Sequence, residues 1–327
     1  MAPAPTASLV LDSVDGLPGW RGSFSIYQER AFAEVFASLY DLQVIEADGV
    51  LLLVSRRPLL HNMSAFVGSP AIPEPFALWW ARVESLECSQ VEIQGAPPLP
   101  ALERHRTSAA DCFSFVVDLR LGEEALWTGL SHECRKAIRK GRRAGLEIRE
   151  TQDERDLRAF YGQLLLASEG GRRFAIAPYR ALCGVMRSGF GRLFLSLAKG
   201  RPVGGAFYVV STSLYGWFSC FLRELAPDTP SNSLYWEVIR WGATRGLRFH
   251  DFGVQSLSGQ GGLTLFKKSY RPFLVPACSY RVPQSQLKLG LGSLLRRLRS
   301  SLRAGADAVD RDTVSEVAQT GLPGTSP

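Results

Sequence analysis

The chain has 327 residues, of which 46% are hydrophobic and 21% charged, so it is long enough and apolar enough for two folded domains. It contains no run of about 18 apolar residues, and we therefore expect no membrane-spanning helix. The formal net charge of +7 favours an anionic ligand such as a nucleotide, a tRNA, an acidic sugar or a lipid surface, although a solvated basic surface needs no ligand.

The first 145 residues are predicted to form one mixed α/β domain. Helices are indicated by apolar residues three or four positions apart, and buried strands by short continuous apolar runs. The predicted elements are a helix over 28–40, a strand over 50–54, a helix over 76–86, and short strands over 91–93 and 113–117. The proline-rich stretch 96–100 is predicted to be a loop.

A basic amphipathic helix over 123–144 is predicted to end this domain. Its apolar side chains fall on one face at about 100° per residue, and its basic side chains fall on the other. The basic set comprises Arg135, Lys136, Arg139, Lys140, Arg142 and Arg143. Gly145 is a natural helix stop, so the domain boundary is placed at 145.

The second domain is predicted over 146–283. Its strands are expected at 146–149, 193–198, 203–210, 214–221, 249–252 and 273–280, and its helices at 153–168, 178–187, 233–244 and 261–269. The pair Lys199-Gly200 is predicted to make a hairpin turn. The resulting element order is β-α-α-β-β-β-α-β-α-β.

Beyond the second domain, residues 284–303 read as a basic amphipathic segment with leucines at helical spacing. We expect it either to contact the anionic surface of the inner membrane or to pack on the second domain. Residues 304–327 are small and polar and are expected to be disordered.

The cysteines and histidines are spread singly along the chain, with no C-x-x-C pair, so no metal site is expected. Single cysteines within apolar stretches are typical of reduced cytosolic thiols. Residues 1–8 carry no basic residue ahead of an apolar stretch, so no secretion signal is expected. These observations predict a cytoplasmic protein.

The element order resembles the GNAT acyltransferase fold, and two stretches resemble the FemAB-like family more narrowly. The first is Leu126-Trp127-Thr128-Gly129-Leu130 followed by the basic run from Arg135 to Leu146. The second runs from Leu234 to Tyr270 and includes Phe249-His250-Asp251-Phe252-Gly253, Gly262 and Phe266-Lys267-Lys268-Ser269-Tyr270. The resemblance implies two GNAT-like domains in an α/β (α+β) fold, each with a mixed, mostly antiparallel sheet flanked by helices.

The resemblance also implies transfer of an acyl or aminoacyl group to an amine of a cell-envelope precursor. We expect no permanently bound cofactor, and the acyl donor is left open between acyl-CoA and aminoacyl-tRNA. The chain lacks the coiled-coil arm of some tRNA-using members. It also lacks the glutamine- or arginine-led glycine loop that in GNAT enzymes precedes the helix corresponding to 233–244 and holds the pyrophosphate of coenzyme A.

Two side chains are predicted to be catalytic. His250 and Asp251 end a strand and should point to opposite faces. By the resemblance, Asp251 orients the acceptor amine, and Lys267 contacts the anionic substrate or the reacting carbonyl as a point charge. The structural alternatives are that Asp251 caps the following turn and that Lys267 is an ordinary surface lysine.

Eight further residues are predicted to bind substrate. Four lie on the basic helix and could contact phosphates: Arg135, Arg139, Lys140 and Arg143. The others are Ser233 at a helix start, Gly253 and Gly262 in a glycine-rich turn, and Lys268. The alternative interpretations are a solvated helix face, an N-cap and a flexible turn.

The sequence therefore predicts an acyltransferase or aminoacyltransferase acting on an envelope or polysaccharide precursor, with tRNA and the inner membrane as further candidate partners. The alternative hypothesis is a catalytically inactive copy of the fold that binds an anionic glycan or a nucleic acid through its basic face.

Overall fold

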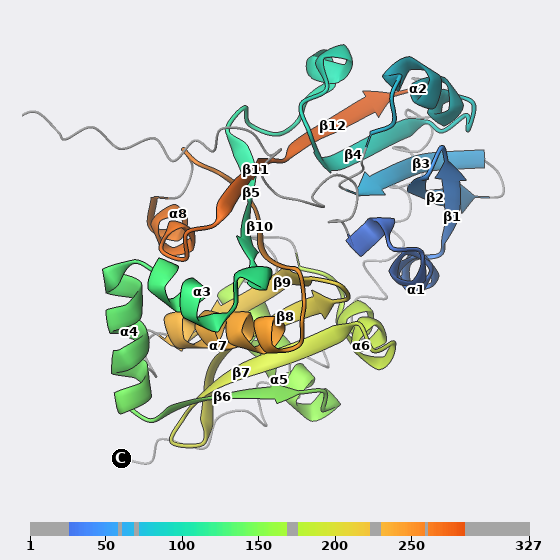
Figure 1. The fold of residues 1–327 in the computed structure, drawn as a ribbon. Helices are drawn as coiled ribbons and strands as arrows, with labels where there is room; N and C mark the ends of the chain where they lie inside the picture. The colour runs from blue at the N-terminus through green and yellow to red at the C-terminus, as the bar shows by residue number, and fades with distance from the viewer. Residues whose placement is uncertain are drawn as a thin grey trace, which may run out of the picture.

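The computed structural model describes residues 26–57, 61–68, 72–168, 176–222, 230–258 and 261–284, which form two sheets covered by helices (Figure 1). The predicted α/β (α+β) class with two helix-flanked sheets is confirmed. Apart from Gln284, the predicted basic segment and tail lie outside these residues. Across the described ranges, no helix is both long enough and apolar enough to cross a membrane.

The smaller sheet has five strands in the order β1-β2-β3-β4-β12, of which only the β3–β4 pair is parallel. The strands are β1 (Leu42–Ala47), β2 (Val50–Arg57), β3 (His61–Gly68), β4 (Gln90–Ala96) and β12 (Cys278–Pro283). Helix α2 (Phe76–Glu84) and the 3-10 helix η3 (Pro100–His105) share its apolar core through Trp79 and Leu102. Strands β1 and β3 were not predicted from the sequence.

Helix α1 (Arg30–Tyr40), preceded by the short 3-10 helix η2 (Ile26–Gln28), joins the two sheets. Its Phe32 is fully buried, with ring centroids 5.5 Å from Phe190 and 6.0 Å from Trp217. Phe190 directly precedes one strand of the larger sheet, and Trp217 lies in another. Aromatic packing therefore holds α1 against the larger sheet.

The larger sheet has seven strands in the order β11-β5-β10-β9-β8-β7-β6. They are β11 (Phe273–Pro276), β5 (Cys112–Asp118), β10 (Phe249–Ser256), β9 (Leu214–Phe221), β8 (Arg201–Val210), β7 (Gly191–Ala198) and β6 (Leu146–Thr151). The β9–β10 pair is parallel, and the other pairs of this sheet are antiparallel. Lys199 and Gly200 both have positive φ, which confirms the predicted hairpin turn between β7 and β8.

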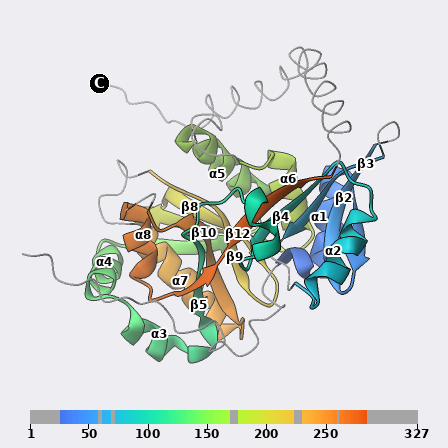
Figure 2. The same ribbon diagram turned by 90° about the horizontal axis from the view of Figure 1, so that it is seen from above.

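Helices cover both faces of the larger sheet (Figure 2). One face carries α5 (Glu154–Ala167) and α6 (Tyr179–Arg187), whose apolar residues form a core with β7 and β8. The other face carries α3 (Glu123–Gly129), α4 (His132–Arg143) and α7 (Pro230–Thr244), which form a second core around Trp236 and Tyr208. The 3-10 helix η4 (Leu119–Leu121) links β5 to α3.

The single basic helix predicted over 123–144 is wrong, because α3 and α4 are separate helices. Leu130 has ψ 149°, outside the helical region, and ends α3. Ser131 then starts α4 by accepting a hydrogen bond on its Oγ from the backbone N–H of Cys134 at 3.1 Å. A serine that caps a helix competes with continued helix through the same position.

The chain crosses between the sheets more than once. The predicted strand 273–280 is two strands, β11 in the larger sheet and β12 in the smaller one. Likewise β5, α3 and α4 lie with the larger sheet, although the predicted boundary at 145 assigned them to the first domain. We propose that the domains follow the sheets, with the first crossing at 106–111 and the return at Ala277.

Candidate active site

The parallel pair β9–β10 is very short, and the two strands then separate. β10 pairs with β9 only at His250 and Asp251, and its register with β5 shifts between Asp251 and Val254. Gly253 makes this bulge possible, because its φ of +82° is unfavourable for any residue with a Cβ. Beyond Tyr215, the edge of β9 that faces β10 therefore has no strand partner among the described strands, which leaves its backbone groups available to an extended ligand.

Asp251 lies where the strands separate. Its Oδ1 accepts hydrogen bonds from Ser114 Oγ at 2.5 Å and from the backbone N–H of Gly253 at 2.7 Å. Burial raises the pKa of Asp251, and these two hydrogen bonds and the charge of Lys267 only partly oppose that rise. Both hydrogen bonds end on Oδ1, so Oδ2 can receive a proton or bind an ammonium group.

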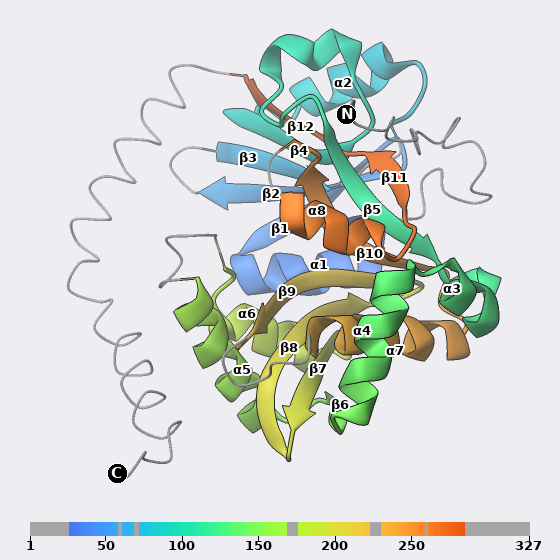
Figure 3. The same ribbon diagram turned by 90° about the vertical axis from the view of Figure 1, so that its left-hand side faces the viewer.

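Lys267 reaches the same place from α8 (Gly261–Lys268), which lies in front of β5 and β10 in Figure 3. The residue is 7% exposed, its Nζ donates to the carbonyl of Gly253 at 3.2 Å, and it lies 5.2 Å from the centroid of the Phe115 ring. Burial lowers its pKa to about 8, against the opposing effect of Asp251. The alternative of an ordinary surface lysine is therefore excluded.

Asp251 and Lys267 thus both form hydrogen bonds to the backbone of Gly253. The carboxylate accepts from its N–H, and the ammonium group donates to its carbonyl. Burial shifts the pKa of each side chain toward the other, upward for Asp251 and downward for Lys267. Titratable pairs of this kind are typical of sites that move protons at neutral pH.

His250 lies on the opposite face of β10, as the strand alternation predicted. It is fully buried, its Nε2 is 3.1 Å from the hydroxyl of Tyr208, and its ring packs 4.3 Å from that of Phe252. Burial lowers its pKa to about 3, so the ring is neutral at physiological pH. Its contacts are those of a core residue.

The predicted substrate-binding residues of α4 fall into two groups. Arg135 donates to the carbonyls of Thr128 at 2.8 Å and Leu130 at 2.6 Å, and Arg139 lies over the ring of Trp127. These two arginines therefore stabilise the end of α3. Lys140 and Arg143, together with Lys136, lie on the exposed side of the helix.

The other predicted substrate-binding residues do not all lie near Lys267. Ser233 does not stand at a helix start, because α7 begins at Pro230; it is 4% exposed and packs against Gly141 of α4. Gly262 and Lys268 are exposed on α8, Gly262 beside open space at its beginning and Lys268 at its end. Gly253 thus contacts Lys267, and Gly262 and Lys268 lie on the same helix as Lys267, whereas Ser233 packs against α4.

Sequence reasoning missed Ser114. It is 7% exposed and supplies the shortest hydrogen bond to Asp251. The available signal was a single hydroxyl within the otherwise apolar strand 113–117, since a buried polar group needs a partner. Within the described ranges, His, Cys, Asp and Glu side chains form no group of three that could hold a metal ion.

A comparison with protein families matches residues 130–266 to the acetyltransferase (GNAT) domain. No curated protein sequence matches the chain. Among solved structures, the chain is similar to FemX with a TM-score of 0.60 and 13% identity, over 80% of this chain and 93% of that one.

Two further solved structures are also similar. L-PGS from Bacillus licheniformis has a TM-score of 0.54 and 14% identity, over 77% of this chain and 90% of that one. The C-terminal domain of a putative lysylphosphatidylglycerol synthetase from Agrobacterium fabrum has a TM-score of 0.52 and 15% identity, over 80% of this chain and 89% of that one. At these identities the likeness concerns the fold.

The GNAT domain match covers α4, the β6–β10 strands and most of α8. It includes Asp251 and ends at Phe266, one residue before Lys267. Residues 130–266 thus match a domain of the acetyltransferase (GNAT) type, and the overall fold is similar to that of FemX.

Proposed function

We propose that this chain transfers an acyl or aminoacyl group to an amine on a cell-envelope or polysaccharide precursor, with Asp251 and Lys267 at the reacting centre. The observation that supports this most directly is their meeting at Gly253, where β9 and β10 separate within the GNAT domain. Acyl transfer needs its substrates held in place and a proton-accepting group beside them. The unpaired edge of β9 could hold an extended substrate, and Asp251 lies beside it.

In the reaction the amine nitrogen bonds to the carbonyl carbon, and the bond from that carbon to the leaving sulfur or oxygen breaks. The amine loses a proton and the leaving group gains one. Asp251 is suited to bind the incoming ammonium group and take its proton, because its raised pKa makes it a stronger base than an exposed carboxylate. Lys267 is suited to stabilise negative charge on the carbonyl oxygen or on the acyl donor.

Two observations bear on the substrates. The similar solved structures named FemX and lysylphosphatidylglycerol synthetase favour an aminoacyl group and an envelope acceptor for this chain as well. The exposed cations Lys136, Lys140 and Arg143 on α4 favour an anionic substrate, which both acyl-CoA and aminoacyl-tRNA would be. Location in the cytoplasm, with residues 286–303 on the inner membrane, is part of the same proposal.

The same basic face supports the second candidate, a catalytically inactive protein that binds an anionic glycan or nucleic acid. That function predicts strongly salt-dependent binding without turnover. Replacing Lys136, Lys140 and Arg143 would abolish it, whereas Asp251→Asn would leave it intact.

The deciding experiment incubates purified full-length protein with acyl-CoA or aminoacyl-tRNA and a panel of amino sugars and peptides, and detects new amides by mass spectrometry. We expect transfer from one donor class and a loss of at least about 100-fold in Lys267→Met and Asp251→Asn. The control Lys199→Met, whose lysine is exposed in the turn between β7 and β8, should show little change. Absence of transfer over the whole panel, or full activity of both site variants, would refute the proposal.

A further inference from the structure

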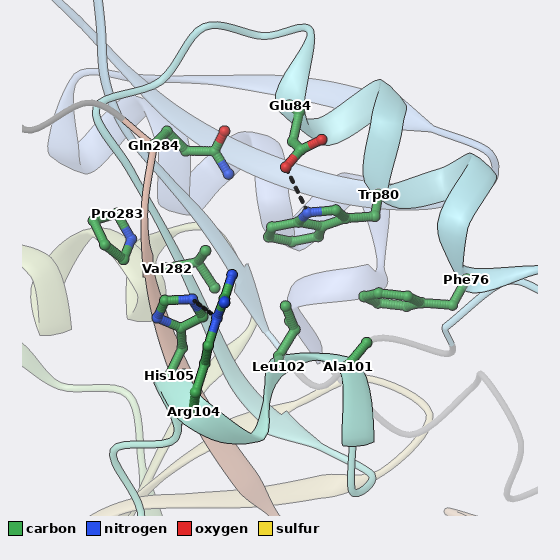
Figure 4. Close-up of a pocket in the computed structure, with 10 residues that line it drawn as sticks. All are labelled: Phe76, Trp80, Glu84, Ala101, Leu102, Arg104, His105, Val282, Pro283 and Gln284. Carbon is green, nitrogen blue, oxygen red and sulfur yellow. Dashed lines mark hydrogen bonds between the residues drawn. The ribbon is translucent and has the colours of Figure 1, made fainter.

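A pocket of about 290 Å³ lies on the smaller sheet, between α2, η3 and the end of β12 (Figure 4). Figures 1 and 2 place α2 at the end of the molecule away from α8. The pocket is therefore separate from the Asp251–Lys267 site. Its volume is at the lower end of the range for small-ligand pockets, of the order of 300 Å³, which suits a single ring rather than an extended chain.

One wall of the pocket is aromatic. Phe76, Trp80 and Glu84 follow each other at i, i+4 and i+8, so they lie along one side of α2. The rings of Phe76 and Trp80 are nearly parallel, at 13°, with centroids 5.8 Å apart. The indole N–H of Trp80 donates to Glu84 Oε1 at 2.8 Å, which holds the orientation of the indole and leaves Glu84 Oε2 as a hydrogen-bond acceptor.

The facing wall carries hydrogen-bond donors. Arg104 Nε donates to His105 Nε2 at 3.0 Å, so Nε2 acts as the acceptor and Nδ1 is left to donate to a ligand. The terminal nitrogens of Arg104 supply further donors on the same side (Figure 4). Leu102 and Val282, both buried, form an apolar floor between the two walls.

We propose that this pocket binds one neutral pyranose unit of a glycan. One face of a pyranose ring consists of C–H groups, which match the negative face of the indole, while its hydroxyl groups both donate and accept. Glu84 would accept from hydroxyls and Arg104 would donate to them. Glu84 on one wall balances the charge of Arg104 on the other, so the pocket offers no excess positive charge to a phosphate, and a nucleotide fits less well.

Such a site goes beyond the proposed transfer reaction, because it lies away from the reacting centre and its binding needs neither Asp251 nor Lys267. It would attach the protein to a polysaccharide by a region far from the chemistry. Attachment and turnover can therefore be measured independently of each other.

The test titrates full-length protein with methyl glycosides and short neutral oligosaccharides and measures binding by saturation-transfer NMR and calorimetry. Uridine monophosphate and an aromatic peptide are titrated in the same way as representatives of two other ligand classes. We expect binding of at least one sugar with a Kd of about 1 mM, since a single ring makes few contacts. The sugar should bind at least about tenfold more weakly to Trp80→Leu and to Glu84→Gln.

Two controls make the test specific. Leu78 is 66% exposed on α2 but does not line the pocket, so Leu78→Ser should bind the sugar as the wild type does. Lys267→Met should also bind normally, which separates this proposal from the proposed transfer. The proposal is overturned if no sugar binds at about 50 mM, if sugar binding survives in both Trp80→Leu and Glu84→Gln, or if only the nucleotide or the peptide binds.

Discussion

Replacing Lys267 with methionine should make the protein more stable while removing its activity. The lysine is 7% exposed, and burial of its charged form lowers its pKa from 10.5 to about 8. A difference of about 2.5 pKa units corresponds to a penalty of roughly 3 kcal/mol for keeping the lysine charged in the folded protein. Methionine has a similar length and carries no charge to bury.

Part of this gain is offset, because methionine loses the hydrogen bond to Gly253 and the contact with the Phe115 ring, each of which contributes about 1 kcal/mol. We therefore expect Lys267→Met to raise the free energy of unfolding by roughly 1–3 kcal/mol at pH 7. A residue that lowers stability at its position is retained for chemistry rather than for folding.

The pH dependence provides the critical check. Between pH 8 and 10.5 the unfolded chain keeps the lysine proton while the folded protein has lost it, so wild-type stability rises across this window. The difference in the free energy of unfolding between Lys267→Met and the wild type should therefore decrease over the same pH window. Urea unfolding followed by tryptophan fluorescence at pH 7, 8.5 and 10 measures this, with the exposed Lys268→Met as a control that should show no such trend. A variant that is less stable at pH 7 by an amount independent of pH would refute the reasoning.

Three further predictions concern neighbouring contacts. Ser114→Ala removes a hydrogen bond that lowers the pKa of Asp251, so the pKa of this carboxyl group should rise further, measured by carbon-13 NMR, whereas Ser114→Thr should restore the wild-type value. A Cβ on Gly141 would lie 2.3 Å from Ser233 Oγ, so Gly141→Ala should lower stability by about 1–3 kcal/mol, and adding Ser233→Ala should recover most of it in thermal unfolding. The pKa of His250 is about 3 in the folded protein rather than 6.5, so the unfolded chain binds its proton first and wild-type stability should fall as the pH drops below 6.5. The slope should reach about 1.4 kcal/mol per pH unit, and His250→Gln should lack it. Equal slopes in the two proteins would contradict this prediction.

Local signals were sufficient for most helices and for the central strands of the larger sheet. Apolar spacing placed α1, α5 and α6 within one or two residues of their observed bounds, and the Lys199-Gly200 turn was recognisable from residue type. The same signals failed where a cap overrode a long amphipathic pattern, as at Ser131, and where one apolar run was divided between two sheets, as at Ala277. Strand partners are set by long-range contacts that no local window contains.

The candidate site shows the same division. By itself, the sequence determined which residue types gather in 249–270 and that Asp251 and His250 face opposite sides of a strand, because a strand alternates its side chains wherever it pairs. Only the tertiary structure decided that Lys267 is buried rather than exposed, that Ser114 holds Asp251, and that Ser233 is packed away from both. Burial and partners depend on which distant strands and helices come together, and these set the shifted pKa values of Asp251 and Lys267.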